Sequence, residues 1–109
     1  RKFDLTKALT MWTNFIKWRQ ENKIDAIDSY DFPEISEVKK YYPHGYFRTD
    51  KQGRPIYIER IGQLKLQQLF KVTSQERLVK YYCQSYERLL NQIFPACSAA
   101  AGRPIAQTV

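Results

Sequence analysis

The sequence is poor in the residues that build metal centres. It contains one histidine, His44, and only two cysteines, Cys83 and Cys97, among 109 residues. One histidine and two distant cysteines cannot supply the four ligands of a typical zinc site. The two cysteines also form no recognisable disulfide framework, and we favour reduced thiols in an intracellular protein over a disulfide.

Motifs of hydrolytic and nucleotide-dependent enzymes are also missing. The sequence has no nucleophile elbow, no P-loop and no dinucleotide-binding glycine pattern, and Gly45 and Gly53 are typical of turns. Glu59 is a possible catalytic carboxylate, but no second group pairs with it, so we interpret it as an exposed or ion-paired side chain. We therefore predict that the protein is not an enzyme and carries no catalytic residue and no metal.

Long hydrophobic runs are absent, since no segment approaches the roughly 18 apolar residues of a membrane-spanning helix. The chain starts at Arg1 without an initiator methionine or a signal-peptide pattern. Its last residues, 104–109, read as a strand that is just beginning. We therefore expect this sequence to be a piece of a longer protein.

Basic residues outnumber acidic ones, with a formal net charge of +7. Such a charge favours acidic partners: phospholipid headgroups, nucleic acid or an acidic protein surface. The basic residues are scattered along the chain, so a solvated basic surface is the simpler alternative. We do not favour nucleic-acid binding, because rings such as Trp12, Phe15 and Tyr82 fall on helix positions that we expect to face the core, whereas a stacking platform needs exposed rings.

Hydrophobic periodicity predicts an α+β order of elements. Asp4 can cap a helix with an apolar face, and Pro33 can open a shorter one. A turn ending in Gly53 joins two extended runs. Residues 73–76 read as a capping box that opens a long helix, which Pro95 would end. The predicted elements are helices at 4–21, 34–41 and 66–70, a hairpin of 46–49 with 55–61, a helix from 73 to 94, and a strand starting near 104.

Tyrosines gather around this predicted hairpin. Four of the twenty residues from Tyr41 to Arg60 are tyrosines. Such a surface is apolar but can also form hydrogen bonds, which suits ligand contacts as well as packing. Tyr57 alternates with Ile56 and Ile58, so it points to the opposite face of the sheet. From the residues alone, buried core tyrosines and ligand-binding tyrosines both remain open, with the core interpretation favoured.

Three segments together resemble a known family. RKFDLTKALTMWTNFIKWRQEN, YYPHGYFRTDKQGRPIYIERIG and KVTSQERLVKYYCQSYERLLNQIFPACSAAAGR follow, in order, the pattern of yeast-type phosphatidylinositol/phosphatidylcholine transfer proteins of the CRAL-TRIO class. The resemblance implies an α/β fold, with a helical bundle followed by a mixed five-stranded sheet that holds one phospholipid under a gate helix. Residues 1–45 would be the end of the helical region. Residues 46–109 would be the truncated start of the lipid-binding domain.

The resemblance also implies roles for particular residues. Arg1 matches an arginine that contacts the inositol phosphate, and Lys2 and Asp50 are weaker candidates near that headgroup. Tyr46, Tyr57 and Tyr86 resemble aromatic residues near the phosphocholine, where ring faces attract the ammonium and hydroxyls bind the phosphate. This turns our preference for these three tyrosines towards ligand contact. Phe47 departs from the family, where many relatives have a polar residue.

The resulting hypothesis is a cytoplasmic protein, peripheral to membranes, that binds and exchanges or senses phospholipids. Its partners would be phosphatidylinositol, phosphatidylcholine or a related lipid as cargo, an anionic membrane surface, possible assembly proteins and no nucleic acid; no cofactor is expected. The alternative is a non-catalytic scaffold subunit of a larger assembly that reuses the same fold.

Overall fold

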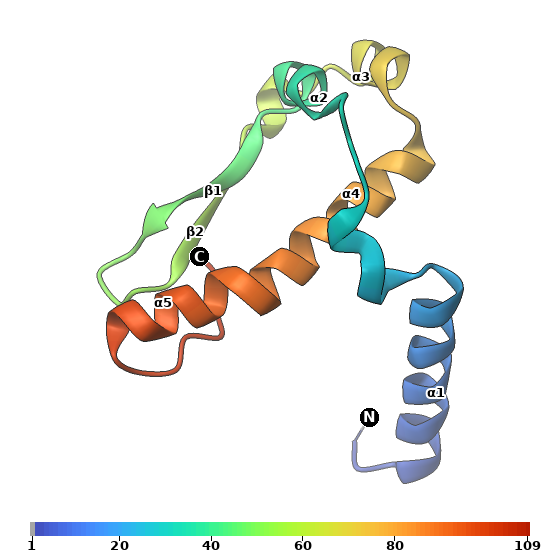
Figure 1. Ribbon diagram of the computed structural model, residues 1–109, viewed down its shortest axis with the longest axis vertical. Helices are drawn as coiled ribbons and strands as arrows, with labels where there is room; N and C mark the ends of the chain where they lie inside the picture. The colour runs from blue at the N-terminus through green and yellow to red at the C-terminus, as the bar shows by residue number, and fades with distance from the viewer. Residues whose placement is uncertain (1) are drawn as a thin grey trace.

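The computed structural model describes residues 2–109 and is mostly helical, with one two-stranded antiparallel sheet (Figure 1). Arg1, the predicted contact of the inositol phosphate, lies outside the described residues. Three shorter helical segments connect the main elements: 3-10 turns at Ile24–Ser29 and Ile61–Gln63 and a π-helical turn at Leu89–Ile93. The main elements are α1 (Leu5–Glu21), α2 (Ile35–Tyr41), β1 (His44–Thr49), β2 (Pro55–Glu59), α3 (Leu66–Val72), α4 (Gln75–Arg88) and α5 (Phe94–Ala101).

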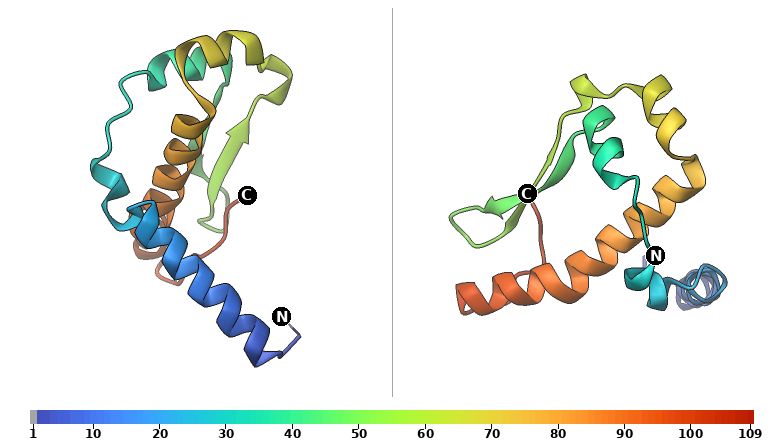
Figure 2. Two further views of the ribbon diagram at one scale, coloured as in Figure 1. Left: turned by 90° about the vertical axis from the view of Figure 1, so that its right-hand side faces the viewer. Right: turned by 45° about the horizontal axis from the view of Figure 1, so that its top comes forward.

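The β1–β2 hairpin and the α4–α5 helix form two arms that face each other (Figures 1 and 2). At one end, α2 and α3 pack together through Val38 and Leu69, which are each 1% exposed. At the other end, the hairpin turn lies close to α5, because a Cβ built on Gly53 would stand 3.1 Å from the Cβ of Ala101. Gly53 has a φ of +82°, the conformation that glycine adopts without strain.

The 3-10 helix Ile24–Ser29 packs on α4 and buries Ile24 and Ile27. The side-chain amide of Gln84, on α4, donates hydrogen bonds of 2.9 Å to the carbonyl oxygens of Ile27 and Tyr30. Arg19, on α1, is paired with Glu87 at 2.8 Å. The N-terminal segment is therefore attached to α4 by polar contacts as well as by apolar burial.

The N-cap of α1 is Asp4, whose carboxylate accepts from the Lys7 amide at 3.0 Å, as the sequence predicted. The prediction that its apolar stripe faces a core is wrong for the described residues. Helix α1 contains no buried residue, and Leu9 and Trp12 are 66% and 60% exposed. The reason is that α1 projects away from the remaining elements (Figure 1). The expected burial of aromatic rings on α1, used above against nucleic-acid binding, therefore does not hold here.

Two predictions about α4 are corrected. The N-cap is Ser74 rather than Thr73, because the Ser74 hydroxyl accepts from the Arg77 amide at 3.2 Å. Pro95 does not end the helical run, which continues to Ala101. Pro95 lies in the first turn of α5, where a missing N–H is tolerated, directly after the π-helical turn at Leu89–Ile93. The helix ends instead at Gly102, which has a φ of +65°.

No regular strand forms near Pro104, contrary to the sequence prediction. The amide of Ile105 donates to the Ser98 hydroxyl at 2.8 Å, and Ile105 is buried, so this segment is held against α5. Only Val109 reaches β2. Its amide donates to the Pro55 carbonyl at 3.0 Å and its carbonyl accepts from the Tyr57 amide at 2.7 Å. This is a parallel pairing, on the side of β2 opposite to β1.

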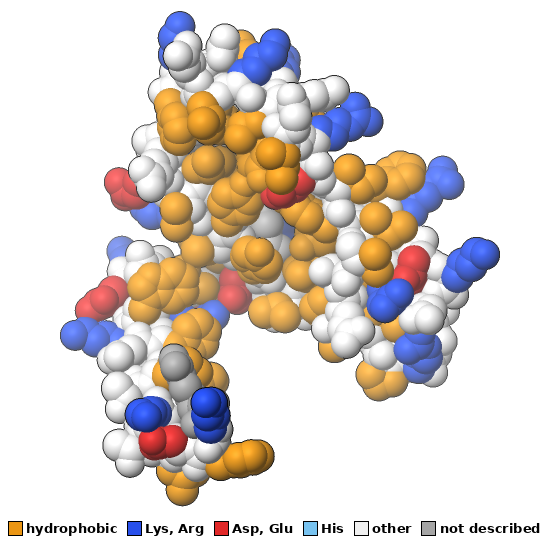
Figure 3. Space-filling view, turned by 180° about the vertical axis from the view of Figure 1, so that it is seen from behind, with side chains coloured by type: hydrophobic (Ala, Val, Ile, Leu, Met, Phe, Trp, Pro, Cys, Tyr) orange, Lys and Arg blue, Asp and Glu red, His pale blue; other side chains and the backbone are white. Residues whose placement is uncertain are grey.

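Hydrophobic side chains gather in the middle of the face seen in Figure 3, and Lys and Arg side chains lie mainly along its margins. The two-arm arrangement thus leaves apolar surface in contact with solvent. The predicted division between residues 45 and 46 falls within β1 and stays a prediction.

Candidate functional site

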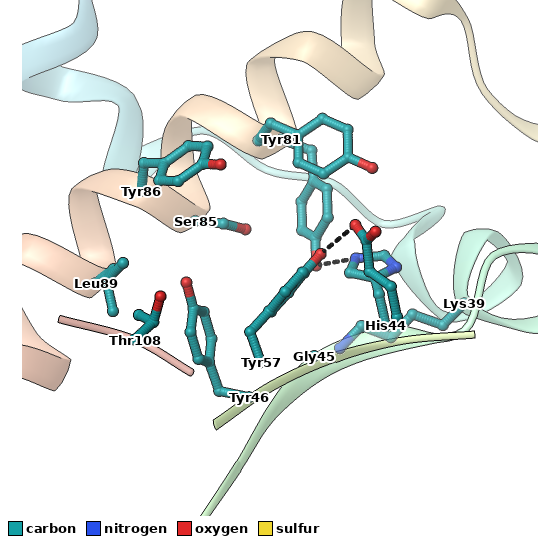
Figure 4. A pocket seen from close by; sticks show the side chains of 12 residues that line it. Lys39, His44, Gly45, Tyr46, Tyr57, Tyr81, Ser85, Tyr86, Leu89 and Thr108 are labelled. Carbon is teal, nitrogen blue, oxygen red and sulfur yellow. Dashed lines mark hydrogen bonds between the residues drawn. The ribbon is translucent and has the colours of Figure 1, made fainter. Parts of the chain in front are cut away.

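A cavity of about 240 Å³ lies between the hairpin and α4 (Figure 4). Tyr46 and Tyr57 reach it from β1 and β2, and Tyr86 reaches it from α4. All three tyrosines singled out in the sequence therefore line one cavity. Its other lining residues are Lys39, His44, Gly45, Glu59, Tyr81, Tyr82, Ser85, Leu89 and Thr108.

The hairpin register explains why two of these rings meet. Tyr46 is the direct partner of Tyr57 across the antiparallel pair, so both side chains lie on the same face. Their ring centroids are 5.1 Å apart and the planes are inclined at 51°. Burial raises the pKa of the Tyr46 hydroxyl, which therefore stays protonated at neutral pH.

The opposite wall of the cavity comes from α4. Tyr86 is 62% exposed, and Ser85 and Leu89 lie beside it. Figure 4 shows the Tyr46 ring standing up from the hairpin towards this wall. The sequence placed Tyr86 on an inner stripe, whereas here its ring borders an open space that the two arms leave between them.

Glu59 forms the acidic pole of the cavity. Its carboxylate accepts a hydrogen bond from the Tyr57 hydroxyl at 2.8 Å and another from the Tyr42 hydroxyl. The bonds from Tyr42 and then from Tyr57 lower the pKa of Glu59. Burial, followed by the bond to Glu59, raises the pKa of both hydroxyls. Glu59 is thus a tyrosine-bound carboxylate, not one of a catalytic pair.

His44 links the cavity to a cluster of aromatic rings. Its Nδ1 lies 2.7 Å from the Tyr42 carbonyl, and because a carbonyl can only accept, Nδ1 carries the proton. In the neutral ring Nε2 then accepts from the Tyr81 hydroxyl, 3.1 Å away. The His44 ring also packs against Tyr42 and Tyr82, with centroid distances of 4.6 and 6.3 Å. This side of the cavity is therefore ordered by rings and hydrogen bonds together.

Of the residues predicted for the phosphoinositol headgroup, the two described ones, Lys2 and Asp50, do not line this cavity. Asp50 lies in the hairpin turn, where Oδ1 accepts from the amides of Gln52 and Arg54 at 2.8 and 2.9 Å, and Oδ2 accepts from Arg54 Nε at 2.8 Å. The bonds from the Arg54 amide and side chain lower the pKa of Asp50. Lys2 is exposed before α1, away from the hairpin (Figure 1).

Several lining residues were missed by the sequence reasoning. His44 was considered only as a metal ligand, and Glu59 only as a catalytic carboxylate. Tyr81 and Tyr82 are neighbours on α4, and both reach this cavity. The period-2 alternation that placed Glu59 on the same face as Tyr57 was available as a signal. No signal of this kind connects Lys39 or Thr108 with the cavity, because only the tertiary fold brings them there.

The chemistry of the cavity suits a polar headgroup. Ring faces and a carboxylate attract an ammonium, whereas hydroxyls and Lys39 can bind a phosphate. The volume is below the range of about 300–1,000 Å³ that is typical of pockets for drug-sized ligands, so the cavity suits a small polar group. Among the described residues, no group of three or more His, Cys, Asp or Glu side chains could hold a metal ion.

Comparison with known proteins finds relatives that match nearly the whole chain. Phosphatidylinositol/phosphatidylcholine transfer proteins SFH9 and SFH4 of Arabidopsis thaliana are 47% and 48% identical to this chain, each over 96% of it. SEC14 cytosolic factor of Kluyveromyces lactis is 44% identical over 94% of the chain. The chain is a homologue of the Sec14-like transfer proteins of the CRAL-TRIO family. The resemblance inferred from the sequence is thereby confirmed.

The homology covers a limited part of each relative. The chain spans 18% of SFH9, 17% of SFH4 and 34% of the Kluyveromyces protein. No protein-family model matches the chain. These relatives are named for transfer of lipids and not for catalysis, in agreement with the prediction of a protein that is not an enzyme. Within residues 2–109, no helix has both the length and the apolar character needed to cross a membrane.

Proposed function

We propose that this chain is part of a protein that binds phosphatidylinositol or phosphatidylcholine and exchanges it between membranes, or senses it. The observation that carries the proposal is the convergence of Tyr46, Tyr57 and Tyr86 on one cavity in a chain whose relatives are named as transfer proteins for these lipids. Exchange requires binding without chemistry, and a cavity of rings and hydroxyls provides for binding.

In this proposal the tyrosine cavity receives the phosphocholine headgroup. The ammonium lies against the faces of Tyr46 and Tyr86, within the roughly 6 Å at which ring quadrupoles attract cations. Hydroxyls of the cavity other than that of Tyr86, with Lys39, bind the phosphate. Acyl chains extend past Leu89, along apolar surface that the two arms leave exposed.

Arg1, Lys2 and Asp50 remain proposed contacts of the phosphoinositol headgroup. They would form a second subsite, separate from the tyrosine cavity. For Asp50 the role is indirect, because its carboxylate is already occupied in the hairpin turn and would act by holding Arg54 and the turn in place.

The finer fold is also part of the proposal. Residues 1–45 would be the end of a helical bundle, and residues 46–109 the start of a mixed sheet covered by helices. The parallel pairing of Val109 with β2 supports this, because it is how a third strand would join the sheet. A location in the cytoplasm, with transient contact to anionic membranes, fits one relative's name as a cytosolic factor and the net charge of +7.

The test is to purify the protein gently from its own cells, extract it with organic solvent and identify stoichiometric lipid by mass spectrometry. About one phosphatidylinositol or phosphatidylcholine molecule per chain is expected. A protein that arrives without lipid but within a defined complex would overturn the proposal and favour the scaffold alternative.

A further inference from the structure

The hairpin has a second face that the cavity does not use. A β-bulge separates the pairs Tyr46–Tyr57 and Thr49–Pro55, so that Phe47 and Arg48 together oppose a single residue of β2. Phe47 is 57% exposed, and the guanidinium carbon of Arg48 lies 5.3 Å from the centre of its ring. The bulge thus presents an aromatic ring and a cation side by side to solvent.

Arg48 occupies an unusual backbone conformation. Its φ is +55°, the left-handed region that glycine adopts freely and that costs an arginine roughly 1 kcal/mol. Strain of this kind, stored at a bulge, is common where a protein re-aims a side chain for function. Arginine at this position therefore calls for an explanation beyond the geometry of the turn.

The neighbouring surface extends the same pattern. Ile58 is 43% exposed and lies opposite Gly45, which has no side chain to cover it. A shallow hollow of about 260 Å³ forms there, lined by Phe47, Ile58 and Arg60 among others. Residues 43–47, 58 and 60 line this hollow and include no carboxylate. Arg48 and Arg60 make no ion pair with any described residue, whereas Arg19, Arg54, Arg77 and Arg88 are all paired.

We propose that Phe47, Arg48, Ile58 and Arg60, which we call the outer hairpin patch, dock onto an anionic membrane surface. Exposed apolar side chains beside unpaired arginines match acyl chains beside acidic headgroups. The patch lies on the face of β1–β2 opposite to Tyr46 and Tyr57, so docking leaves the cavity free. This inference rests on the proposed function, because it identifies the surface by which a lipid-exchange protein meets its membrane.

The test uses the whole protein, purified from its own cells as the wild type and as single-substitution variants. Binding is measured to two kinds of vesicle: phosphatidylcholine alone, and phosphatidylcholine with about 30% phosphatidylserine, which gives a negatively charged surface. Arg48→Gln and Arg60→Gln are each expected to weaken binding to the anionic vesicles about fivefold, and the pair about thirtyfold. Adding Phe47→Ala to the arginine pair is expected to weaken binding to the anionic vesicles further. Binding to neutral vesicles stays low throughout.

Lys17→Gln with Lys23→Gln is the control, because it removes two positive charges from exposed positions outside the hairpin. The ion pair of Lys17 with Glu21, 3.8 Å apart, is exposed and contributes little energy. Arg48→Gly separates docking from folding: it removes the charge but relieves the positive φ, so the fold is kept while binding falls about fivefold. An equal loss of binding in the control pair and in the arginine pair would overturn the proposal, as would unchanged binding of Arg48→Gly.

A third outcome distinguishes edge protection from docking. Since β1 is an edge strand among the described elements, its bulge and arginine could serve to prevent strand-to-strand aggregation. Aggregation of Arg48→Gln in size-exclusion chromatography, with vesicle binding of the monomer unchanged, would overturn docking in favour of that role. The proposed function is tested separately, by extracting lipid from each variant and identifying it by mass spectrometry. Loss of vesicle binding with one lipid per chain retained would affect docking alone, whereas loss of the bound lipid with vesicle binding retained would affect the proposed function alone.

Discussion

At the scale of single residues, the three cavity tyrosines differ in how their hydroxyls are used. The Tyr57 hydroxyl donates to Glu59, while among residues 2–109 no hydrogen-bond partner lies at the Tyr86 hydroxyl. The Tyr86 ring is also the most exposed of the three. The proposed ligand contact of Tyr86 therefore rests on its ring, whereas the Tyr57 hydroxyl is bonded to Glu59.

Replacing Tyr86 with leucine removes the ring face proposed for the choline ammonium. Because one such contact contributes about 1 kcal/mol, phosphatidylcholine binding is expected to fall about fivefold, with phosphatidylinositol binding unchanged. Competition between labelled lipids in a transfer assay measures both. Tyr86→Phe keeps the ring and serves as the control. Equal loss for both lipids, or loss in Tyr86→Phe as well, would contradict a cation–π role.

Glu59 provides a pH prediction. Because hydrogen bonds from Tyr42 and Tyr57 hold its pKa below the ordinary value of 4.5, they stabilise the fold above that pH. The stabilisation is lost as the pH falls through the lower folded-state pKa. A carbon-13 NMR titration of the carboxyl is expected to show the pKa rising towards 4.5 in Tyr42→Phe. An identical pKa in the wild type and in this variant would disprove the assignment.

At the scale of elements, α4 is the part that organises both halves of the chain. One side carries Tyr81, Tyr82 and Tyr86 to the cavity, and another holds the N-terminal segment through Gln84 and Glu87. Gln84 is 4% exposed, and a buried amide is stable there only because backbone carbonyls accept its protons.

Gln84→Leu keeps the approximate size of the side chain but removes its amide donor, so that the Tyr30 carbonyl loses this bond and the Ile27 carbonyl keeps only the bond from the Tyr30 amide. A loss of about 1–3 kcal/mol in the free energy of unfolding is expected, because buried polar groups without partners are costly. Urea unfolding of the protein from its own cells measures it. The exposed Gln67 offers a matched control, and Gln67→Leu should change stability by less than about 0.5 kcal/mol. Similar effects of both substitutions would show that Gln84 is not an anchor.

At the scale of the whole molecule, residues 2–109 are extended. Their radius of gyration is 16.7 Å, whereas a compact domain of this length has about 13 Å. The largest exposed side chains include Leu5, Leu9 and Trp12 on α1 and Leu90 in the π-helical turn. For a chain of this shape we expect the burial of apolar surface to be too small to offset the conformational entropy of folding.

We therefore expect residues 1–109 in isolation to melt without cooperativity. Thermal unfolding followed by circular dichroism and by calorimetry measures this directly. The protein from its own cells is the control and should show a sharp transition. A cooperative melt of the isolated chain would refute the expectation.

Local sequence determined the local elements. Asp4 and the apolar spacing after it specify α1, and Asp50 with Gly53 specifies the hairpin turn, because caps and turns use groups that are only a few residues apart. Alternation along β2 also placed Tyr57 opposite Ile56 and Ile58. The family pattern then identified Tyr46, Tyr57 and Tyr86 as a set, which periodicity could not have done.

Only the tertiary structure decided which of these residues meet. It brought α4 over the hairpin, so that Tyr86 shares a cavity with Tyr46 and Tyr57, and it left Asp50 occupied in a turn. It also left the apolar face of α1 exposed. The helical run continues past Pro95, because Pro95 lies in the first turn of α5, directly after the π-helical turn, where its missing N–H is tolerated. The physical reason is the sequence separation of the interacting residues. Hydrophobic periodicity shows that one face of an element prefers burial, but the residues that bury it lie far away in the sequence.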